Sequence, residues 1–216
     1  MNAFKILGNY ENIFSNRYGY LLLYSWYNRC GDDMNVVFGG SFNPPTIAHK
    51  SIIELVIKNF DVDTFLVIPV GNDYHKNDLV DYQHRISMLN ILVKGMKYVV
   101  ISDIEANGSY KGTLNLLDQL SKVYKNIHFI IGSDQLYDLT NWIEYDKLLR
   151  TYKFIVIKRF GYKIDNDITK KYPASFIYLD LDMDVSSNQI RKNLDEYQSF
   201  TTSEVYDYIK KNNLYE

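Results

Sequence analysis

The sequence predicts an α/β fold with a doubly wound, mostly parallel sheet and additional helices at the C-terminus. Short apolar runs rich in Ile, Val and Phe alternate along the chain with longer segments whose apolar residues recur at helical spacing. Such continuous runs are typical of parallel strands, because helices cover both faces of a parallel sheet. The length of 216 residues suits one domain with a full core.

The expected elements follow one another in regular order. The runs expected to form strands are residues 34–40, 64–71, 97–102, 126–134, 152–159 and 175–182. Helices are expected at about residues 46–60, 81–93 and 113–123. Two further helix candidates close the chain. In the second of them, Thr201 is expected to be the N-cap, with Glu204 as its capping-box partner.

The first strand suggests where the domain begins. The run MNVVFGG, residues 34–40, starts with its own methionine and ends at two glycines. Residues 1–33 contain one candidate amphipathic helix, at about residues 17–29, and no spacing of residues that points to chemistry. We therefore expect residues 1–33 to be an N-terminal addition and residues 34–216 to form the functional domain.

Charge and cysteine content limit the classes of partner. The chain has 24 Lys and Arg against 26 Asp and Glu, so no basic field favours nucleic acid or a membrane surface. Cys30 is the only cysteine, which excludes an internal disulfide and fits a reducing compartment. The longest apolar stretch, residues 18–27, is too short to span a bilayer. We expect a cytoplasmic protein with small-molecule partners, and a homo-oligomer stays open.

The stretch FGGSFNPPTIAHK, residues 38–50, joins the first expected strand to the first expected helix. In an open parallel sheet, ligands bind beyond the carboxyl ends of the strands, and the N-terminus of the next helix attracts phosphate. Gly39 and Gly40 permit a tight turn at this point. Pro44 and Pro45 suit the entrance of the helix, where a missing N–H costs little.

Thr46 and His49 are three residues apart at the start of this helix, so they share one helical face. A hydroxyl and an imidazole placed there can both donate to one phosphate oxygen. The alternative is structural, with the glycine pair ending an ordinary strand and His49 a polar residue whose hydrogen bonds are satisfied. The surrounding residues favour the phosphate interpretation.

The whole string resembles the signature of the nucleotidylyltransferase superfamily. The matching residues are Gly39, Gly40, Phe42, Asn43, Pro44, Thr46 and His49. Two later stretches, IGSDQLYDLTNW at 131–142 and VSSNQIRKNL at 185–194, resemble motifs of the nicotinate and nicotinamide mononucleotide adenylyltransferases. The ending VYDYIKKNNLY, residues 205–215, resembles the closing helix of that family. The resemblance covers residues 34–215 and implies a Rossmann-like nucleotidylyltransferase fold.

An ATP site follows from the resemblance. His49, Thr46 and Arg191 are its implied catalytic residues, with Arg191 near the β- and γ-phosphates. The implied ATP-binding residues are Gly39, Gly40, Ser41, Phe42, Asn43, His49, Gly132, Asp134, Ser187 and Arg191. Asp134 is expected to accept from ribose hydroxyls, to cap the following helix, or to do both. Arg191 taken alone would instead form a surface ion pair with Asp195 or a neighbouring carboxylate.

A second set of residues is implied for the mononucleotide. Its members are Lys76, Tyr110, Lys111 and Trp142. Lys76 would bind the phosphate, and Trp142 would stack on the electron-poor pyridine ring. A solvated lysine and a core tryptophan are the structural alternatives. His84 and Arg85 are further candidates for phosphate, whereas His128 is expected to fill the core or the surface.

The chain departs from the family pattern in two places. Asn188 stands where a threonine is usual, and supplies an amide instead of a hydroxyl. GSYKGTL, residues 108–114, is one residue shorter than the Ser-Tyr-Thr pattern at which contacts to a pyridine carboxylate are expected.

The implied reaction is adenylyl transfer from ATP to nicotinate mononucleotide, which yields nicotinate adenine dinucleotide and pyrophosphate in NAD biosynthesis. Mg²⁺ is expected to arrive with ATP, and no protein ligand set for a metal is expected. Lys111 and nearby glycine amides favour the anionic acid, whereas Asp138 would oppose it if it pointed inward. The alternatives are nicotinamide mononucleotide or phosphopantetheine as acceptor, and a catalytically idle nucleotide-binding module.

Overall fold

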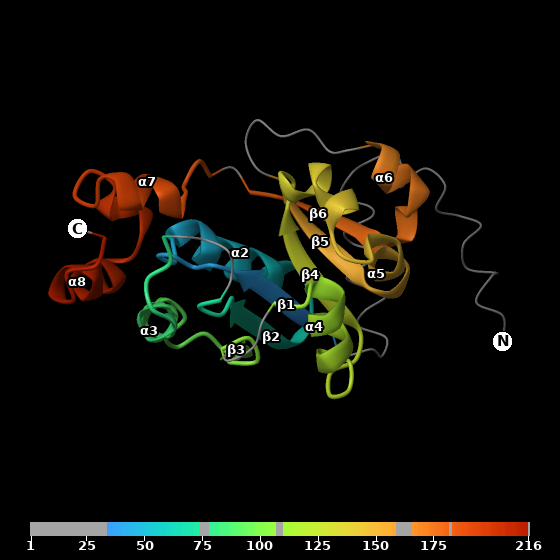
Figure 1. The fold of residues 1–216 in the computed structure, drawn as a ribbon, viewed down its shortest axis with the longest axis horizontal. Helices are drawn as coiled ribbons and strands as arrows, with labels where there is room; N and C mark the ends of the chain where they lie inside the picture. The colour runs from blue at the N-terminus through green and yellow to red at the C-terminus, as the bar shows by residue number, and fades with distance from the viewer. Residues whose placement is uncertain (1–33, 74–77, 107–109, 159–165, 182, 216) are drawn as a thin grey trace.

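The computed structural model describes residues 34–73, 78–106, 110–158, 166–181 and 183–215 (Figure 1). A six-stranded sheet with the strand order β3-β2-β1-β4-β5-β6 lies at the centre of this described part. The strands are β1 (Met34–Gly40), β2 (Val62–Pro69), β3 (Val99–Ile101), β4 (Ile127–Gly132), β5 (Lys153–Lys158) and β6 (Phe176–Asp180). All their pairings are parallel. The prediction of a doubly wound α/β fold is therefore confirmed.

Helices connect successive strands and close the chain. They are α2 (Ile47–Asn59), α3 (Tyr82–Leu92), α4 (Thr113–Leu120), α5 (Tyr145–Thr151), α6 (Asn166–Lys171), α7 (Ser187–Lys192) and α8 (Ser203–Lys211). Short 3₁₀ turns are η3 (Gln135–Tyr137), η4 (Leu139–Asn141), η5 (Pro173–Ser175) and η6 (Gln198–Phe200). The three helices predicted between strands correspond to α2, α3 and α4. Neither α5 nor α6 was predicted, because each is too short to show a clear apolar period.

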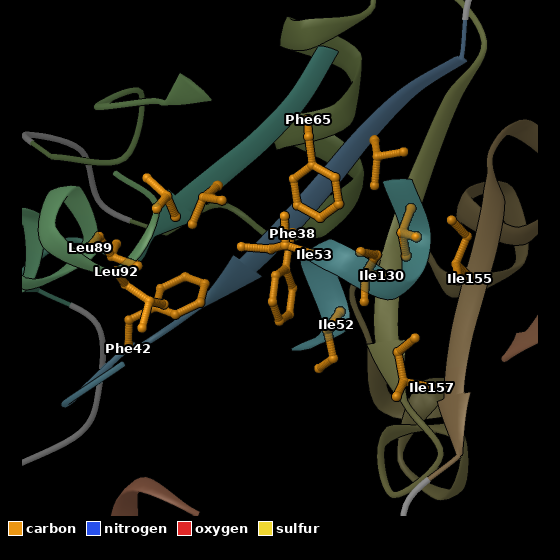
Figure 2. Close-up of a cluster of buried hydrophobic side chains, with 14 of the residues drawn as sticks. Phe38, Phe42, Ile52, Ile53, Phe65, Leu89, Leu92, Ile130, Ile155 and Ile157 are labelled. Atoms are coloured by element: carbon orange, nitrogen blue, oxygen red, sulfur yellow. The ribbon is translucent and has the colours of Figure 1, made fainter. Parts of the chain in front are cut away.

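Apolar side chains cover both faces of the sheet. In β1, Val36 and Phe38 face one layer, while Val37 faces the other. Figure 2 shows the first layer, where side chains of the sheet meet those of α2 and α3; its labelled members are Phe38, Phe42, Ile52, Ile53, Phe65, Leu89, Leu92, Ile130, Ile155 and Ile157. Residues of α4, α5 and α6 belong to the second layer. Burial on both faces explains why the strands read as continuous apolar runs.

The C-terminal helices lie at one end of the molecule. In Figure 1, α7 and α8 lie at the end away from β6, and α8 packs beside α3. The N-cap of α8 is Thr202, whose hydroxyl accepts from the N–H of Val205. The predicted N-cap, Thr201, is therefore wrong by one residue. Thr201 is buried, and its hydroxyl instead donates to the carbonyl of Pro45 at 2.9 Å.

The strand order places the site. Chain order reverses between the neighbouring strands β1 and β4, and ligands of open α/β sheets bind at such a switch point. Gly40 ends β1 and Gly132 ends β4, so the two predicted phosphate motifs start at the same edge. The predicted addition, residues 1–33, lies outside the described residues. Within the described ranges, no helix has the length and apolar character that crossing a bilayer requires.

Candidate active site

The loop between β1 and α2 is tightly packed at its start. A Cβ on Gly40 would lie 3.2 Å from the ring of Phe42, so only glycine lets that ring approach. Phe42 has a positive φ of 46° and is 1% exposed. Its ring meets Phe38 edge-on at 5.4 Å and His49 at 5.0 Å between centroids. Phe42 thus forms an apolar support beneath the imidazole of His49.

Thr46 and His49 form a capping box at the start of α2. The backbone N–H of Thr46 donates to His49 Nδ1 at 2.9 Å, and the Thr46 hydroxyl lies 2.8 Å from the same nitrogen. A nitrogen that accepts from a backbone N–H carries no proton, so we assign the proton to Nε2. The capping box therefore fixes the orientation of the His49 ring, with its proton on Nε2.

Three predicted ATP-site residues are buried. Thr46 is 0% exposed, Phe42 1% and Asn43 2%. Their burial favours a supporting role over direct contact with a nucleotide. Pro44 and Pro45 are buried too, and both precede the N-cap of α2. The prediction that they occupy the helix entrance therefore needs correction, since the first helical residue is Ile47.

Side chains from the C-terminal segments hold this loop through three successive carbonyls. Arg191 Nη1 donates to the carbonyl of Asn43 at 2.7 Å, and Ser187 donates to that of Pro44 at 2.7 Å. Thr201, already described, bonds the carbonyl of Pro45. Two of these carbonyls belong to prolines, which have no backbone N–H. The loop therefore has few N–H donors of its own at this point, and its carbonyls accept from the C-terminal side chains.

Arg191 lies at the centre of this contact. Its Nη2 approaches Asn188 Oδ1 at 3.5 Å, so the residue that replaces the usual threonine contacts the guanidinium. Within the described residues, Arg191 forms no ion pair with Asp195, which instead accepts from Tyr206 at 2.8 Å and pairs with Lys210 at 3.1 Å. The surface ion-pair interpretation of Arg191 is therefore wrong. A guanidinium has five N–H donors, so Arg191 keeps capacity for an anion.

Arg85 was a candidate for phosphate, but it is fully buried. Its guanidinium donates to the carbonyls of Val80, Ser41 and Val70 at 3.0, 3.1 and 2.7 Å, and to Asn72 Oδ1 at 3.2 Å. These acceptors lie just after β1, just after β2 and in the approach to α3. Arg85 therefore ties the exits of two neighbouring strands together, and the prediction that it approaches phosphate is wrong.

His84 and His128, the two further histidines among the described residues, also have structural partners. His84 Nδ1 lies 3.0 Å from the hydroxyl of Tyr208, which links α3 to α8. His128 is fully buried in β4, as expected of a core residue, and its Nδ1 lies 3.0 Å from the carbonyl of Asn126. Burial lowers the pKa of His128 from 6.5 to about 4. His128 is therefore neutral at physiological pH.

A pocket of about 410 Å³ opens beside the exit of β1. Its lining includes Gly39, Gly40, Ser41, Tyr110, Phe129 and Trp142. The half-buried Trp142 ring meets Phe129 edge-on at 6.3 Å between centroids. The structure thus brings Tyr110 and Trp142 together with the phosphate loop. Lys111 is exposed and does not contribute to the lining, and Lys76 lies outside the described residues.

Two acids and one helix end also line the pocket. Burial raises the pKa of the Glu105 carboxyl, and Asp138 accepts from Asn141 Nδ2 at 2.6 Å. The N-terminus of α4 contributes Thr113 to the lining. Its N-cap, Gly112, has φ +90° and no capping side chain, so the first N–H groups of α4 have no cap.

The exit of β4 offers fewer donors than expected. The N–H of Gly132 already donates to Gln135 Oε1 at 3.0 Å. Asp134 precedes η3 without a side-chain capping hydrogen bond, so its interpretation as a cap fails. The ribose role of Asp134 stays a prediction. Within the described ranges, no group of three or more His, Cys, Asp or Glu residues could hold a metal ion.

Comparison with known proteins identifies the family. A family model described as cytidylyltransferase-like matches residues 37–193. A relative from Acholeplasma laidlawii, named probable nicotinate-nucleotide adenylyltransferase, is 38% identical over 184 residues, which is 85% of this chain and 98% of the relative. The chain belongs to the nicotinate-nucleotide adenylyltransferase family.

Further comparisons agree with the assignment of this family. A relative of the same name from Sulfurimonas denitrificans is 33% identical over 83% of this chain and 96% of its own length. The solved structure of Plasmodium falciparum nicotinic acid mononucleotide adenylyltransferase complexed with NaAD superposes with a TM-score of 0.72. It is 26% identical, over 85% of this chain and 97% of that one.

Sequence reasoning missed several residues of this adenylyltransferase site. Glu105 and Phe129 line the pocket, and a Cβ on Gly71 would lie 2.4 Å from the carbonyl oxygen of Glu105. The hydroxyl of Tyr215 donates to Asn43 across 172 positions of sequence. Local spacing carries no signal for such contacts, although the closing Leu-Tyr pair of the family ending marked the position of Tyr215.

Proposed function

We propose that this enzyme transfers the adenylyl group of ATP to the phosphate of nicotinate mononucleotide and releases pyrophosphate. One observation carries the proposal. The segment Gly39–Ser41 lines the pocket of about 410 Å³ and continues directly into the loop that contacts His49 and Arg191. An acceptor in the pocket and a triphosphate on the loop would therefore meet at the end of β1.

The names of similar proteins support this assignment. The relatives are named for nicotinate nucleotide as the acceptor, and the Plasmodium falciparum structure holds NaAD. NaAD is the dinucleotide that this transfer would yield. A dinucleotide spans both halves of the site, as the pocket and the phosphate loop would require.

The proposed chemistry is an in-line displacement at phosphorus. An oxygen of the mononucleotide phosphate attacks the α-phosphorus of ATP. A new P–O bond forms at the α-phosphorus. The bond between the α-phosphorus and the oxygen that bridges it to the β-phosphate breaks, and its electron pair leaves with pyrophosphate. Because the attacking phosphate is already an anion, no strong general base is needed. The protein mainly holds the groups in line and stabilises negative charge.

The residues divide this work between them. His49 Nε2–H donates to the α-phosphate, because the capping box fixes its orientation. The N-terminus of α2 adds backbone N–H groups and the positive end of its dipole. Arg191 binds the β- and γ-phosphates with the donors that Asn43 and Asn188 do not use. Thr46 positions His49 and does not bind phosphate itself.

Mg²⁺ is proposed to enter as its complex with the triphosphate. The groups at the phosphate loop are N–H donors and a guanidinium, which bind phosphate oxygens and not a metal ion. Mg²⁺ in such sites keeps phosphate oxygens and water as most of its ligands. When bound, the ion would neutralise part of the phosphate charge.

The acid form of the acceptor suits the pocket for a reason other than Lys111. The uncapped N-terminus of α4 borders the pocket at Thr113, and a helix N-terminus favours a carboxylate over a neutral amide by about 0.3 to 1 kcal/mol. Asp138 accepts a hydrogen bond from Asn141, so one of its oxygens already has a partner within the protein.

Pyrophosphate release with ATP, Mg²⁺ and each mononucleotide tests the proposal. We expect kcat/KM for nicotinate mononucleotide to exceed that for the amide by about two- to fivefold, which corresponds to the roughly 0.3 to 1 kcal/mol contributed by the helix N-terminus. A tenfold preference for the amide would overturn the acceptor and leave adenylyl transfer intact. If neither mononucleotide gave pyrophosphate release, the whole proposal would be contradicted. The His49→Ala variant, purified in parallel, controls for contaminating enzymes.

A further inference from the structure

The hydroxyl of Tyr215 contacts the phosphate loop from the far end of the chain. It lies 2.8 Å from Asn43 Oδ1, although the two residues are 172 positions apart. The chain returns to the loop because Leu214 packs in the apolar layer under α2 and α3, and its N–H bonds the carbonyl of Ile209 at 3.1 Å. Tyr215 thus contacts Asn43, a buried residue of the phosphate loop.

Asn43 forms hydrogen bonds with several separate segments of the chain. Its Nδ2 donates to the carbonyl of Asp78 at 2.7 Å, and its Oδ1 accepts from the N–H of Val80 at 3.2 Å. Its backbone carbonyl accepts from Arg191 at 2.7 Å. A side-chain amide oxygen has two lone pairs, so Val80 and Tyr215 together fill the acceptor capacity of Oδ1. Asn43 therefore has one defined orientation.

The direction of the Tyr215 bond is also defined. Burial raises the pKa of the Tyr215 phenol, while Arg191 and Arg85 nearby act in the opposite direction. The phenol therefore keeps its proton and donates it to Asn43. Both guanidiniums bond the same loop. Arg191 donates to the carbonyl of Asn43, and Arg85 donates to the carbonyl of Ser41, two residues earlier.

We propose that Tyr215 is a positioning residue for the triphosphate site. Its hydroxyl fixes Asn43, and Asn43 in turn fixes the guanidinium of Arg191. The inference rests on the proposed role of Arg191 toward the β- and γ-phosphates. Removal of the hydroxyl leaves Oδ1 of Asn43 with one donor, so the buried amide can turn. The side chain of Asn43 anchors this part of the loop, so a weaker anchor lets the backbone carbonyl of Asn43, which holds Arg191, shift. The pocket for the mononucleotide has neither Asn43 nor Arg191 in its lining.

Tyr215→Phe in the full chain tests the proposal, because it keeps the ring and removes only the hydroxyl. The affinity for the ATP–Mg²⁺ complex is measured by calorimetry in the absence of the acceptor, so that no transfer takes place. KM is measured for both substrates. We expect ATP affinity to fall about three- to tenfold, the usual effect of one buried hydrogen bond. KM for the mononucleotide should change less than twofold.

Tyr206→Phe is the matched control. It removes a hydroxyl from the same C-terminal region, where Tyr206 donates to the exposed Asp195 at 2.8 Å. We expect this variant to keep the ATP affinity and the KM values of the parent. A fall in ATP affinity equal to that of Tyr215→Phe would overturn the proposal, since it would reflect a general loosening of α8.

A double-mutant cycle separates positioning from packing. If Tyr215 acts through Arg191, the losses in ATP affinity for Tyr215→Phe and Arg191→Lys should not add. Additive losses, or unchanged ATP affinity in Tyr215→Phe, would refute the inference. The calorimetric readout needs no turnover, so failure of the proposed adenylyl transfer would show separately, as an inactive parent enzyme.

Discussion

The imidazole of His49 serves both the protein and the ligand, and the two roles can be separated. Its Nδ1 completes the capping box with Thr46, and we assign its proton to Nε2, the proposed donor to phosphate. Loss of one preorganised donor to developing charge lowers turnover by about two to three orders of magnitude. We therefore expect His49→Ala to remain folded, with kcat reduced by about 100- to 1000-fold in a pyrophosphate-release assay.

His49→Glu is the informative companion, because glutamate is a standard N3 residue of a capping box and its ionised carboxylate has no hydrogen-bond donor. It should restore the bond to the backbone N–H of Thr46 and any stability lost in the alanine variant, as seen by thermal unfolding. Its kcat should stay low, because the donor to the phosphate is missing. If glutamate recovered most of the turnover, the role of His49 would be to cap α2, and the donor role would be wrong.

Protonation of His128 should make the fold sensitive to acid. Its pKa is about 4 in the folded protein, lowered by burial from 6.5. Between these values the unfolded chain binds the proton more readily, so stability falls as pH decreases from about 6.5 to 4. The full effect is about 3 kcal/mol. His128→Gln should flatten the dependence of the unfolding free energy on pH in this window, and an unchanged slope would contradict the assignment.

Local spacing predicted some side chains of the site and missed others. Thr46 and His49 were found because three residues span one helical turn, although Thr46 proved to orient His49 from a buried position. Arg85 was misassigned because its acceptors are backbone carbonyls, which have no sequence signature. The closing motif marked the position of Tyr215, but its contact with Asn43 depends on tertiary packing and could not be predicted from the sequence.

The start of α4 can be tested with a pair of glycines. Gly112 has φ +90°, and an added Cβ would lie 3.1 Å from Ile143 Cβ at the wall of the pocket. Gly95 has φ +81° with nothing within 4 Å. Alanine should cost about 1 kcal/mol of stability at either position, because both need a left-handed backbone. Only Gly112→Ala should raise KM for the mononucleotide, since only there does the new methyl group press on the pocket.

Equal KM values in the two glycine variants would show that the start of α4 does not bound the acceptor site. The unfolding temperature of Gly95→Ala supplies the reference for strain alone. A large loss of ATP affinity in Gly112→Ala would also count against the division of the site into two halves.

Regular elements were predicted well where burial sets the pattern. The strands and α2, α3 and α4 follow from apolar runs and helical spacing. The cap of α8 was wrong by one position, because Thr201 and Thr202 are chemically alike and only the packing against Pro45 distinguishes them. The sequence indicates that a threonine caps the helix, but the tertiary contact decides which of the two neighbouring threonines does so.

The C-terminal segments of the chain contact the phosphate loop, which follows the first strand. Ser187, Arg191 and Thr201 bond its successive carbonyls, and Tyr215 bonds Asn43. The C-terminal segments therefore belong to the site as much as the strand that precedes it. The sheet supplies the edge, and the C-terminal helices fix the conformation of the loop at that edge.

Removal of residues 1–33 tests the predicted boundary of the domain. β1 begins at Met34, which is 0% exposed and pairs with Val62 of β2. The match with the Acholeplasma laidlawii relative covers 85% of this chain and 98% of that protein, so that relative has nearly the length expected of residues 34–216. We expect a chain that begins at Met34 to unfold cooperatively and to keep the turnover of the full chain within about twofold.

A new amino terminus at Met34 would place a charged ammonium beside a buried side chain, and a buried charge without a partner is costly. A second shortened chain, which begins at Gly31, moves that charge outward by three residues and is the matched control. If only the Met34 chain is less stable, the cost is the buried charge and the boundary stands. If both aggregate or lose their thermal transition, residues 1–33 supply part of the core, and the predicted boundary is wrong.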